Sequence, residues 1–158
     1  MRYKICNSAD VGKLKAYLYE NKGEIVPSAI EQMYGNEAAV GMRLNHKMEI
    51  AVVAENESDG SVNGVISAIS PNQDENWTIV ALHVLGADRR KRIACSLIQK
   101  LEEELVNQHG TAKCSASVMN LNREARACYI VNGFEHEGKL SAVDSSKEIA
   151  VLGKIIQR

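Results

Sequence analysis

The sequence predicts an α/β (α+β) protein of one domain, with a mixed, mostly antiparallel central sheet flanked by helices on both faces. Hydrophobic residues alternate with a period of two in some segments and follow a helical period in others, in the order β-α-α-β-β-β-α-β-α-β-β. The run 77–85 is nearly continuous in apolar residues, as expected of a central strand covered on both faces. A length of 158 residues, 45% of them hydrophobic and 25% charged, favours a single domain spanning 1–158.

The first third of the chain is expected to form one strand and two helices. Residues 1–6 form the strand, and the polar segment 7–10 begins a helix whose buried stripe is Val11, Leu14 and Leu18. Ser28 and Glu31 have the spacing of a capping box, which predicts a second helix. The inward-facing residues of this helix are expected to be Ile30, Met33, Tyr34 and Leu44, and glycines 35 and 41 are expected to interrupt it.

The remainder alternates between strands and helices. Residues 49–55 and 62–70 alternate in polarity around an Asp-Gly pair at 59–60, which predicts a β-hairpin. After the strand 77–85, a long helix with an apolar stripe from Ile93 to Leu105 should end at Gly110, followed by a strand at 111–119. Asn122 should cap a short helix that ends at Gly133 in a Schellman motif, and residues 148–156 should close the sheet.

Composition and charge narrow the class of protein. A net charge of −1 provides no overall cationic field, which argues against a nucleic-acid-binding protein. No segment has the length and apolarity of a membrane span, and no signal-peptide pattern opens the chain, so we expect a cytoplasmic protein without membrane contact. Reduced thiols and no metal site are expected, because no ligand spacing links the cysteines (6, 95, 114, 128) and histidines (46, 83, 109, 136).

A basic turn precedes the long helix and predicts an anion site. Arg89, Arg90, Lys91 and Arg92 follow the strand 77–85 after three residues. The first amides of a helix lack intrahelical partners and carry a partial positive charge, so they attract phosphate groups. Arginine side chains add charge-assisted hydrogen bonds. The alternatives are a solvated helix start and, less in keeping with a folded domain, a nuclear-localisation segment.

Two stretches within residues 79–134 carry a family resemblance. One matches the pattern Q/R-x-x-G-x-G/A and reads Arg89-Arg90-Lys91-Arg92-Ile93-Ala94, with Arg92 in place of the central glycine. The other matches N-x-x-A…Y…G-F through Asn122, Ala125, Tyr129, Gly133 and Phe134. In this order and element context, the sequence resembles the GNAT superfamily of acyl-CoA-dependent N-acyltransferases, and the element order fits over essentially the whole chain.

The resemblance implies a GNAT-like fold, acetyl-CoA (CoA) as cofactor and a set of site residues. By resemblance, the turn 89–94 holds the CoA pyrophosphate, Asn122 contacts the pantetheine arm, and Ala125 and Tyr129 also belong to the cofactor site. Backbone amides around Leu82, His83 and Val84 polarise the thioester carbonyl, and Tyr129 protonates the departing thiolate. Arg92 either crowds the diphosphate or replaces lost amide contacts with its guanidinium. Relatives often form homodimers, which makes a dimer a further expectation.

The catalytic base is the least determined part of this prediction. The resemblance implies a glutamate on the fourth or fifth strand, but neither 78–84 nor 113–118 contains a carboxylate. His83 is the titratable side chain there with a suitable reference pKa, and it either takes the amine proton or is a hydrogen-bonded histidine at a strand end. We therefore expect an N-acetyltransferase that acts on a primary amine of a small molecule, peptide or protein N-terminus. The alternative is a catalytically weak or inactive acyl-CoA-binding or regulatory module of the same fold.

Overall fold

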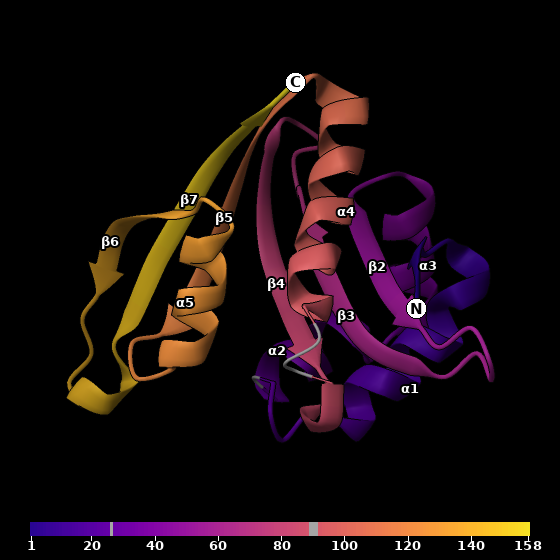
Figure 1. Ribbon diagram of the computed structural model, residues 1–158, viewed down its shortest axis with the longest axis horizontal. Helices are drawn as coiled ribbons and strands as arrows, with labels where there is room; N and C mark the ends of the chain where they lie inside the picture. The colour runs from indigo at the N-terminus through magenta and orange to yellow at the C-terminus, as the bar shows by residue number, and fades with distance from the viewer. Residues whose placement is uncertain (26, 89–91) are drawn as a thin grey trace.

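The structure is a computed structural model that describes residues 1–25, 27–88 and 92–158, with the side chains of 27–29 and 87 also outside the description. These described residues contain seven strands and five α-helices (Figure 1). The strands are β1 (Arg2–Ile5), β2 (Glu49–Glu55), β3 (Val62–Ile69), β4 (Asn76–Val84), β5 (Thr111–Met119), β6 (Glu135–Leu140) and β7 (Ile149–Gln157). The helices are α1 (Val11–Glu20), α2 (Pro27–Tyr34), α3 (Glu37–Asn45), α4 (Ile93–His109) and α5 (Arg123–Val131), and short 3₁₀ turns lie at Ser8–Asp10 (η1), Gly86–Asp88 (η2) and Ser145–Lys147 (η3).

All seven strands form one sheet in the order β1-β2-β3-β4-β5-β7-β6. The only parallel pair among the described strands is β4 with β5, and its register extends only from Asn76–Lys113 to Ile79–Ala116. Ser67 of β3 is opposite Ala81 while Ala68 is opposite Ile79, so Val80 is an extra residue in β4. A bulge of this kind bends the strand that carries it. The bend falls where β4 and β5 stop pairing, and from there the two strands separate.

Helices cover both faces of the sheet, which confirms the predicted fold class. On one face, α4 and α5 pack over the core that contains Leu97, Leu101 and Leu152 (Figure 1). On the other face, α1–α3 pack over a second core that contains Leu14 and Tyr34. Burial of large aliphatic side chains at less than 1% exposure on both faces contributes about 1.5–3 kcal/mol each to folding.

The helices at the start of the chain agree with the sequence pattern, with one division. Asn7 accepts a hydrogen bond from the Ala9 amide and, with Asp10, forms a capping box ahead of α1. The predicted second helix is two helices, since α2 ends at Tyr34 and Asn36 caps α3. Gly35 separates them, because a Cβ there would lie 2.6 Å from the Glu31 carbonyl oxygen. The capping box predicted from the Ser28 side chain lies outside the described residues.

The turn after α5 has the predicted Schellman geometry. The Phe134 amide donates to the Tyr129 carbonyl at 3.0 Å, and the Gly133 amide donates to the Ile130 carbonyl at 3.0 Å. Gly133 has a φ of 90°, a left-handed conformation that glycine adopts without the Cβ penalty. Phe134 is therefore directed back into the core, where its ring lies edge-on to that of Tyr129 at 5.1 Å between centroids.

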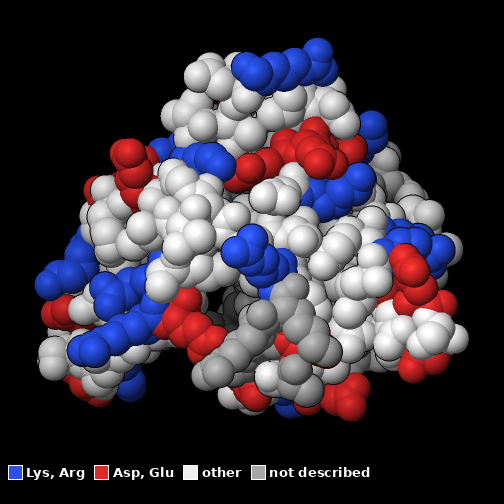
Figure 2. Space-filling model, viewed as in Figure 1, with Lys and Arg blue, Asp and Glu red and all other residues white. Residues whose placement is uncertain are grey.

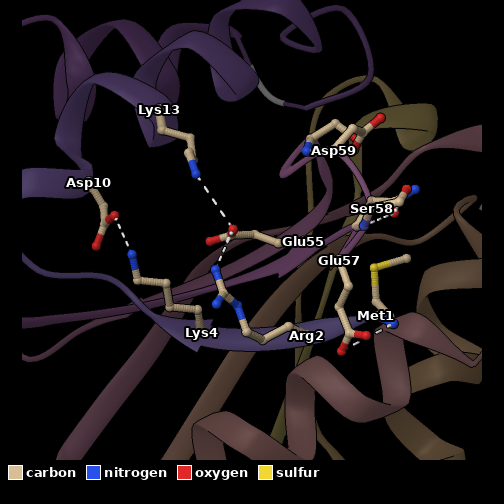
Figure 3. Close-up of polar contacts among 11 residues, drawn as sticks. Met1, Arg2, Lys4, Asp10, Lys13, Glu55, Glu57, Ser58 and Asp59 are labelled. Carbon is tan, nitrogen blue, oxygen red and sulfur yellow. Dashed lines mark hydrogen bonds and ion pairs between the residues drawn. The ribbon is translucent and has the colours of Figure 1, made fainter.

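A polar cluster joins the N-terminal strand to its neighbours (Figure 3). Arg2 donates to Glu55 at 3.0 Å, and Lys13 lies 3.6 Å from the same carboxylate. Lys4 donates to Asp10 at 2.8 Å. These contacts link β1, η1 and α1 to the end of β2 and fix how α1 enters the fold, which matters because the functional cleft uses residues that follow α1.

Candidate active site

A cleft of about 570 Å³ opens where β4 and β5 separate. Figure 2 shows an opening on this face beside the grey residues, with acidic side chains at its rim. Three elements meet at the cleft: the end of β4, the start of α4 and the length of α5. Its lining residues are Glu24, Leu82, His83, Val84, Arg92, Ala94, Cys95, Asn122, Glu124, Ala125, Ala127, Cys128 and Val131.

His83 lies at the end of β4 and is held through both ring nitrogens. Nδ1 lies 2.8 Å from the Tyr17 hydroxyl of α1, and Nε2 lies 2.5 Å from the Glu24 carboxylate. The Tyr17 hydroxyl is also 3.4 Å from the Asn63 carbonyl oxygen. The His83 ring is 5% exposed, so its polar contacts are made almost wholly within the protein. The histidine is thus fixed in orientation at the cleft wall.

The carboxylate of Glu24 determines which nitrogen of His83 carries the proton. An ionised carboxylate only accepts hydrogen bonds, so Nε2 donates to Glu24. In the neutral ring, Nδ1 then accepts from the Tyr17 hydroxyl. Glu24 itself lies in the turn after α1, where its amide donates to the Asn21 carbonyl at 3.0 Å. Asn21 caps α1 by donating its side-chain amide to the Tyr17 carbonyl at 2.8 Å, and so connects the turn to the helix that supplies Tyr17.

The start of α4 has an unusual backbone. Arg92 occupies the N-cap position with φ 59° and ψ 21°, in the left-handed region, and its side chain makes no capping hydrogen bond. This is the position where the motif has glycine, which reaches that region without strain. Arg92 and Ala94 line the cleft, whereas the Ile93 side chain is 2% exposed and belongs to the core. The predicted phosphate residues Arg89, Arg90 and Lys91 lie outside the described residues.

The α5 side of the cleft contains most of the second motif. The Asn122 side chain accepts from the Ala125 amide at 3.1 Å, as an N-cap does, and both residues line the cleft. Tyr129 lies one turn further along but is 3% exposed and is not among the cleft-lining residues. Burial raises the pKa of Tyr129 far above its ordinary value, with smaller contributions from the nearby thiols of Cys114 and Cys128. Its phenol therefore stays protonated at physiological pH.

Two half-buried cysteines of the cleft come from facing helices. Cys95 of α4 and Cys128 of α5 both line it, and the Asn132 side chain bridges the helices by donating to the Cys95 sulfur at 3.4 Å and the Cys128 carbonyl at 2.7 Å. Burial, with the neighbouring Cys95 thiol, raises the pKa of Cys128 to about 11. This thiol is accordingly protonated and unreactive at neutral pH.

The structure brings together seven of the predicted site residues at the cleft: Leu82, His83, Val84, Arg92, Ala94, Asn122 and Ala125. Sequence reasoning did not select Glu24 or Glu124 for the site. Glu124 sits inside the second motif at a variable position, so the motif could have pointed to it. Glu24 is 59 residues from His83 and lies in a turn without a recognisable motif, so no local signal identifies it.

The fold is that of acetyltransferases. An aminoglycoside 6'-acetyltransferase type Ii has a TM-score of 0.74 with 21% identity, over 100% of this chain and 99% of that one. An aminoglycoside 6'-N-acetyltransferase complexed with coenzyme A has a TM-score of 0.73 with 19% identity, over 100% of this chain and 98% of that one. The ribosomal-protein-S5-alanine acetyltransferase from Vibrio fischeri has a TM-score of 0.74 with 13% identity, over 98% of this chain and 92% of that one. A search of curated proteins finds no match.

The sequence profile of the acetyltransferase (GNAT) family matches residues 17–134, and the chain belongs to this family. The resemblance inferred from the two motifs is thereby confirmed, as are the enzyme class, an acetyl-CoA-dependent N-acetyltransferase, and the use of acetyl-CoA. The described helices include none with the length and apolar character needed to cross a bilayer.

The residues of the cleft fit this cofactor. Leu82, Val84 and Val131 provide apolar wall, and Arg92 provides positive charge at the start of α4. In the described part of the chain, β4 has no strand partner on the β5 side beyond Ile79, which leaves that edge open to a bound chain of amides. Apolar walls with a few polar groups at defined positions are characteristic of small-molecule sites.

Proposed function

We propose that this enzyme transfers the acetyl group of acetyl-CoA to a primary amine, of a small molecule or of a peptide or protein N-terminus, by direct attack in a ternary complex. The observation that carries the proposal is the cleft at the separation of β4 and β5, which has cofactor-type groups at α4 and α5 and a histidine–carboxylate pair on its wall. One cleft that receives both reactants allows the protein to catalyse transfer largely by positioning them.

In this proposal the cofactor lies between α4 and α5. Arg92 and the first amides of α4, from Ile93 and Ala94, hold phosphate, together with Arg89, Arg90 and Lys91 from the turn outside the described residues. Asn122 and Ala125 contact the pantetheine arm. The end of β4 at Leu82, His83 and Val84 provides backbone amides to the thioester carbonyl. Acetyl-CoA supplies the activated acyl group, and the protein binds the cofactor and polarises the thioester carbonyl.

We assign proton uptake from the acceptor to Glu24, supported by His83. The amine gives its proton to the carboxylate of Glu24, which lines the cleft. Nε2 of His83 donates to Glu24 before and after this step, and Nδ1 keeps its hydrogen bond with the Tyr17 hydroxyl. Neither ring nitrogen of the buried His83 therefore loses its partner when Glu24 becomes neutral.

Tyr129 is the proposed acid for the leaving thiolate. Its raised pKa keeps the phenol protonated, and its position on α5 is the one in the family motif. Because the ring is 3% exposed and packs on Phe134, the hydroxyl is aimed by core packing and not by flexible surface contacts. We expect Tyr129→Phe to lower kcat by about 10²-fold or more while leaving CoA affinity nearly unchanged.

The experiment that tests the function combines binding with turnover. Acetyl-CoA and CoA, but not ATP, should raise the melting temperature, since a ligand at 100 times its Kd adds about 2.7 kcal/mol, or roughly 5–10 °C for a domain of this size. Release of CoA is then followed in the presence of a panel of primary amines. Turnover by the wild type that Tyr129→Phe abolishes supports the proposal. Binding of CoA without acetyl transfer to any amine would instead indicate a binding or regulatory module.

A further inference from the structure

Two of the four cysteines line the cleft, and the other two lie in the core. Cys95 of α4 and Cys128 of α5 are half-buried members of the cleft lining. By contrast, Cys6 is 7% exposed and Cys114 is 0% exposed. All four are free thiols in this structure. Cys95 and Cys128 are therefore the pair of thiols that a reagent can reach through the cleft.

The side chain of Asn132 holds Cys95 and Cys128 close together. Its amide donates to the Cys95 sulfur at 3.4 Å and to the Cys128 carbonyl oxygen at 2.7 Å, so one amide group reaches from the first thiol to the backbone of the second cysteine. Burial is the main cause that raises the pKa of Cys128, and the Cys95 thiol adds to it through its charge and a hydrogen bond. Lys154 donates to the Asn132 backbone carbonyl at 2.8 Å and fixes the end of α5 that carries the bridge.

We propose that Cys95 and Cys128 form a reversible disulfide when a low-molecular-weight disulfide such as oxidised glutathione enters the cleft, and that this bond excludes acetyl-CoA. The inference rests on the proposed place of the cofactor between α4 and α5, and it adds a modification that controls access to that place. The sulfur atoms of a disulfide are about 2.05 Å apart, closer than two thiols in contact. Its formation therefore joins α4 to α5 by a covalent bridge in the space assigned to the cofactor.

The oxidation proceeds by two steps of thiol–disulfide exchange. The raised pKa of Cys128 leaves it mostly protonated, so we assign the first attack to the Cys95 thiolate. This attack forms a mixed disulfide of Cys95 with glutathione and releases one glutathione thiolate. The Cys128 thiolate then attacks the Cys95 sulfur and releases the second glutathione. The second step is intramolecular, so it proceeds although only a small fraction of Cys128 is ionised.

The balance of the reaction is that of a two-electron oxidation. The two S–H bonds of the cysteines and the S–S bond of oxidised glutathione are replaced by one S–S bond in the protein and two glutathione thiols. Two electrons pass from the cysteines to glutathione, and the two protons that the cysteines lose are taken up by the glutathione thiolates.

The test treats the reduced protein with oxidised glutathione at mildly alkaline pH and follows the product by mass spectrometry. The expected product has lost two hydrogens and contains a peptide in which Cys95 is linked to Cys128, and dithiothreitol restores the dithiol. Cys95→Ser and Cys128→Ser should not form it. Cys6→Ala is the matched control, because it removes a cysteine outside the cleft lining, and it should react at the wild-type rate. Acetyl-CoA at about 100 times its Kd should slow the oxidation about 100-fold, since only protein without cofactor reacts.

The oxidised protein should no longer respond to the cofactor. Acetyl-CoA is expected to raise the melting temperature of the reduced protein by roughly 5–10 °C, and this rise should be absent in the disulfide form and return after reduction. The disulfide closes the loop 95–128 and should itself raise the melting temperature of the protein without ligand. That increase distinguishes a folded protein with a closed cleft from a protein that lost binding because it unfolded.

Failure of this inference can be told from failure of the proposed function. Absence of the linked peptide, or a stable glutathione adduct on Cys95, would overturn the disulfide even if amines are acetylated. A disulfide that forms equally fast in the presence of acetyl-CoA, or that leaves the response to acetyl-CoA intact, would overturn its control of the cleft. If the disulfide forms and blocks acetyl-CoA but the reduced protein acetylates no amine, the inference stands and the catalytic proposal fails.

Discussion

Replacing Arg92 by glycine should stabilise the fold, although most substitutions destabilise a protein. Arg92 has φ 59° and ψ 21° at the N-cap of α4 and makes no capping hydrogen bond with its side chain. A left-handed conformation costs an L-residue about 1–2 kcal/mol, and glycine avoids this cost. The greater freedom of glycine in the unfolded chain offsets about 0.4–1 kcal/mol of the gain. The net expectation is a stabilisation of about 0.5–1 kcal/mol.

The change can be measured by urea unfolding followed through Trp77, the sole tryptophan, which is 1% exposed and donates from its indole to His109. Arg92→Ala is the control, because alanine removes the long side chain but keeps the Cβ that makes the conformation costly. Arg92→Gly should exceed Arg92→Ala by about 1 kcal/mol, or about 2–4 °C in melting temperature. Equal stability of the two variants would refute the argument from backbone strain.

Binding of CoA should move in the opposite direction. Arg92 lines the cleft, and a charge-assisted contact from its guanidinium to phosphate would contribute about 1.5–3 kcal/mol. Both Arg92→Gly and Arg92→Ala should therefore lose about tenfold or more in CoA affinity, measured by calorimetry. A glycine variant that gains both stability and affinity would show that the arginine only crowds the site. Strain retained for the sake of a ligand contact is a recognised trade-off between stability and function.

Two further predictions concern charges that stabilise the fold. Arg43→Leu should cost about 3–5 kcal/mol in urea unfolding, because Arg43 donates at 2.7 Å to Glu49, whose side chain is 0% exposed. The double variant with Glu49→Gln should recover part of that loss, and no recovery would contradict the argument. For Asp10, burial raises the pKa, but the hydrogen bonds from Lys4 and the Asn7 amide outweigh it and leave the pKa below its ordinary value. The ionised carboxylate therefore stabilises the fold above the unfolded-state pKa, and this contribution is lost as pH falls through the lower folded-state value. The stability difference between wild type and Asp10→Asn should thus vanish in acid, and a difference independent of pH would rule out the charge as its source.

The elements that were predicted correctly from the sequence are those specified by residues close together in the chain. The stripe in α4, the hairpin of β2 and β3 and the Gly133–Phe134 turn each follow from residues within one or two turns of each other. The bounds of β6 were not predicted because all six of its residues are exposed, so hydrophobicity does not alternate along it. The division of α2 from α3 was only half visible: Gly35 marked an interruption, but not that Asn36 would cap a new helix.

The site residues also fall into two groups, those specified by a local motif and those brought together only by the tertiary fold. Asn122 and Ala125 belong to a compact motif, and their places in the cleft follow from the helix that Asn122 caps. The contact of Glu24 with His83 spans 59 residues and depends on how α1 packs against the sheet, so it is a tertiary property. The extra residue at Val80 has the same character, since only the register against β3 reveals it.

The proposed cofactor groups and Glu24 lie on different parts of the fold, which affects how readily each can be substituted. The groups proposed for the cofactor lie on the end of β4 and the starts of α4 and α5, where a change at Asn122 would also remove the cap of α5. Glu24 lies in the turn 21–25, which is exposed over most of its length and holds its shape through Asn21. A substitution at Glu24 removes few packing contacts, but it takes away the acceptor of Nε2 of His83, which is 5% exposed. Leaving a buried donor unpaired costs about 1–3 kcal/mol, so position 24 can vary at low cost only among residues that accept a hydrogen bond from His83.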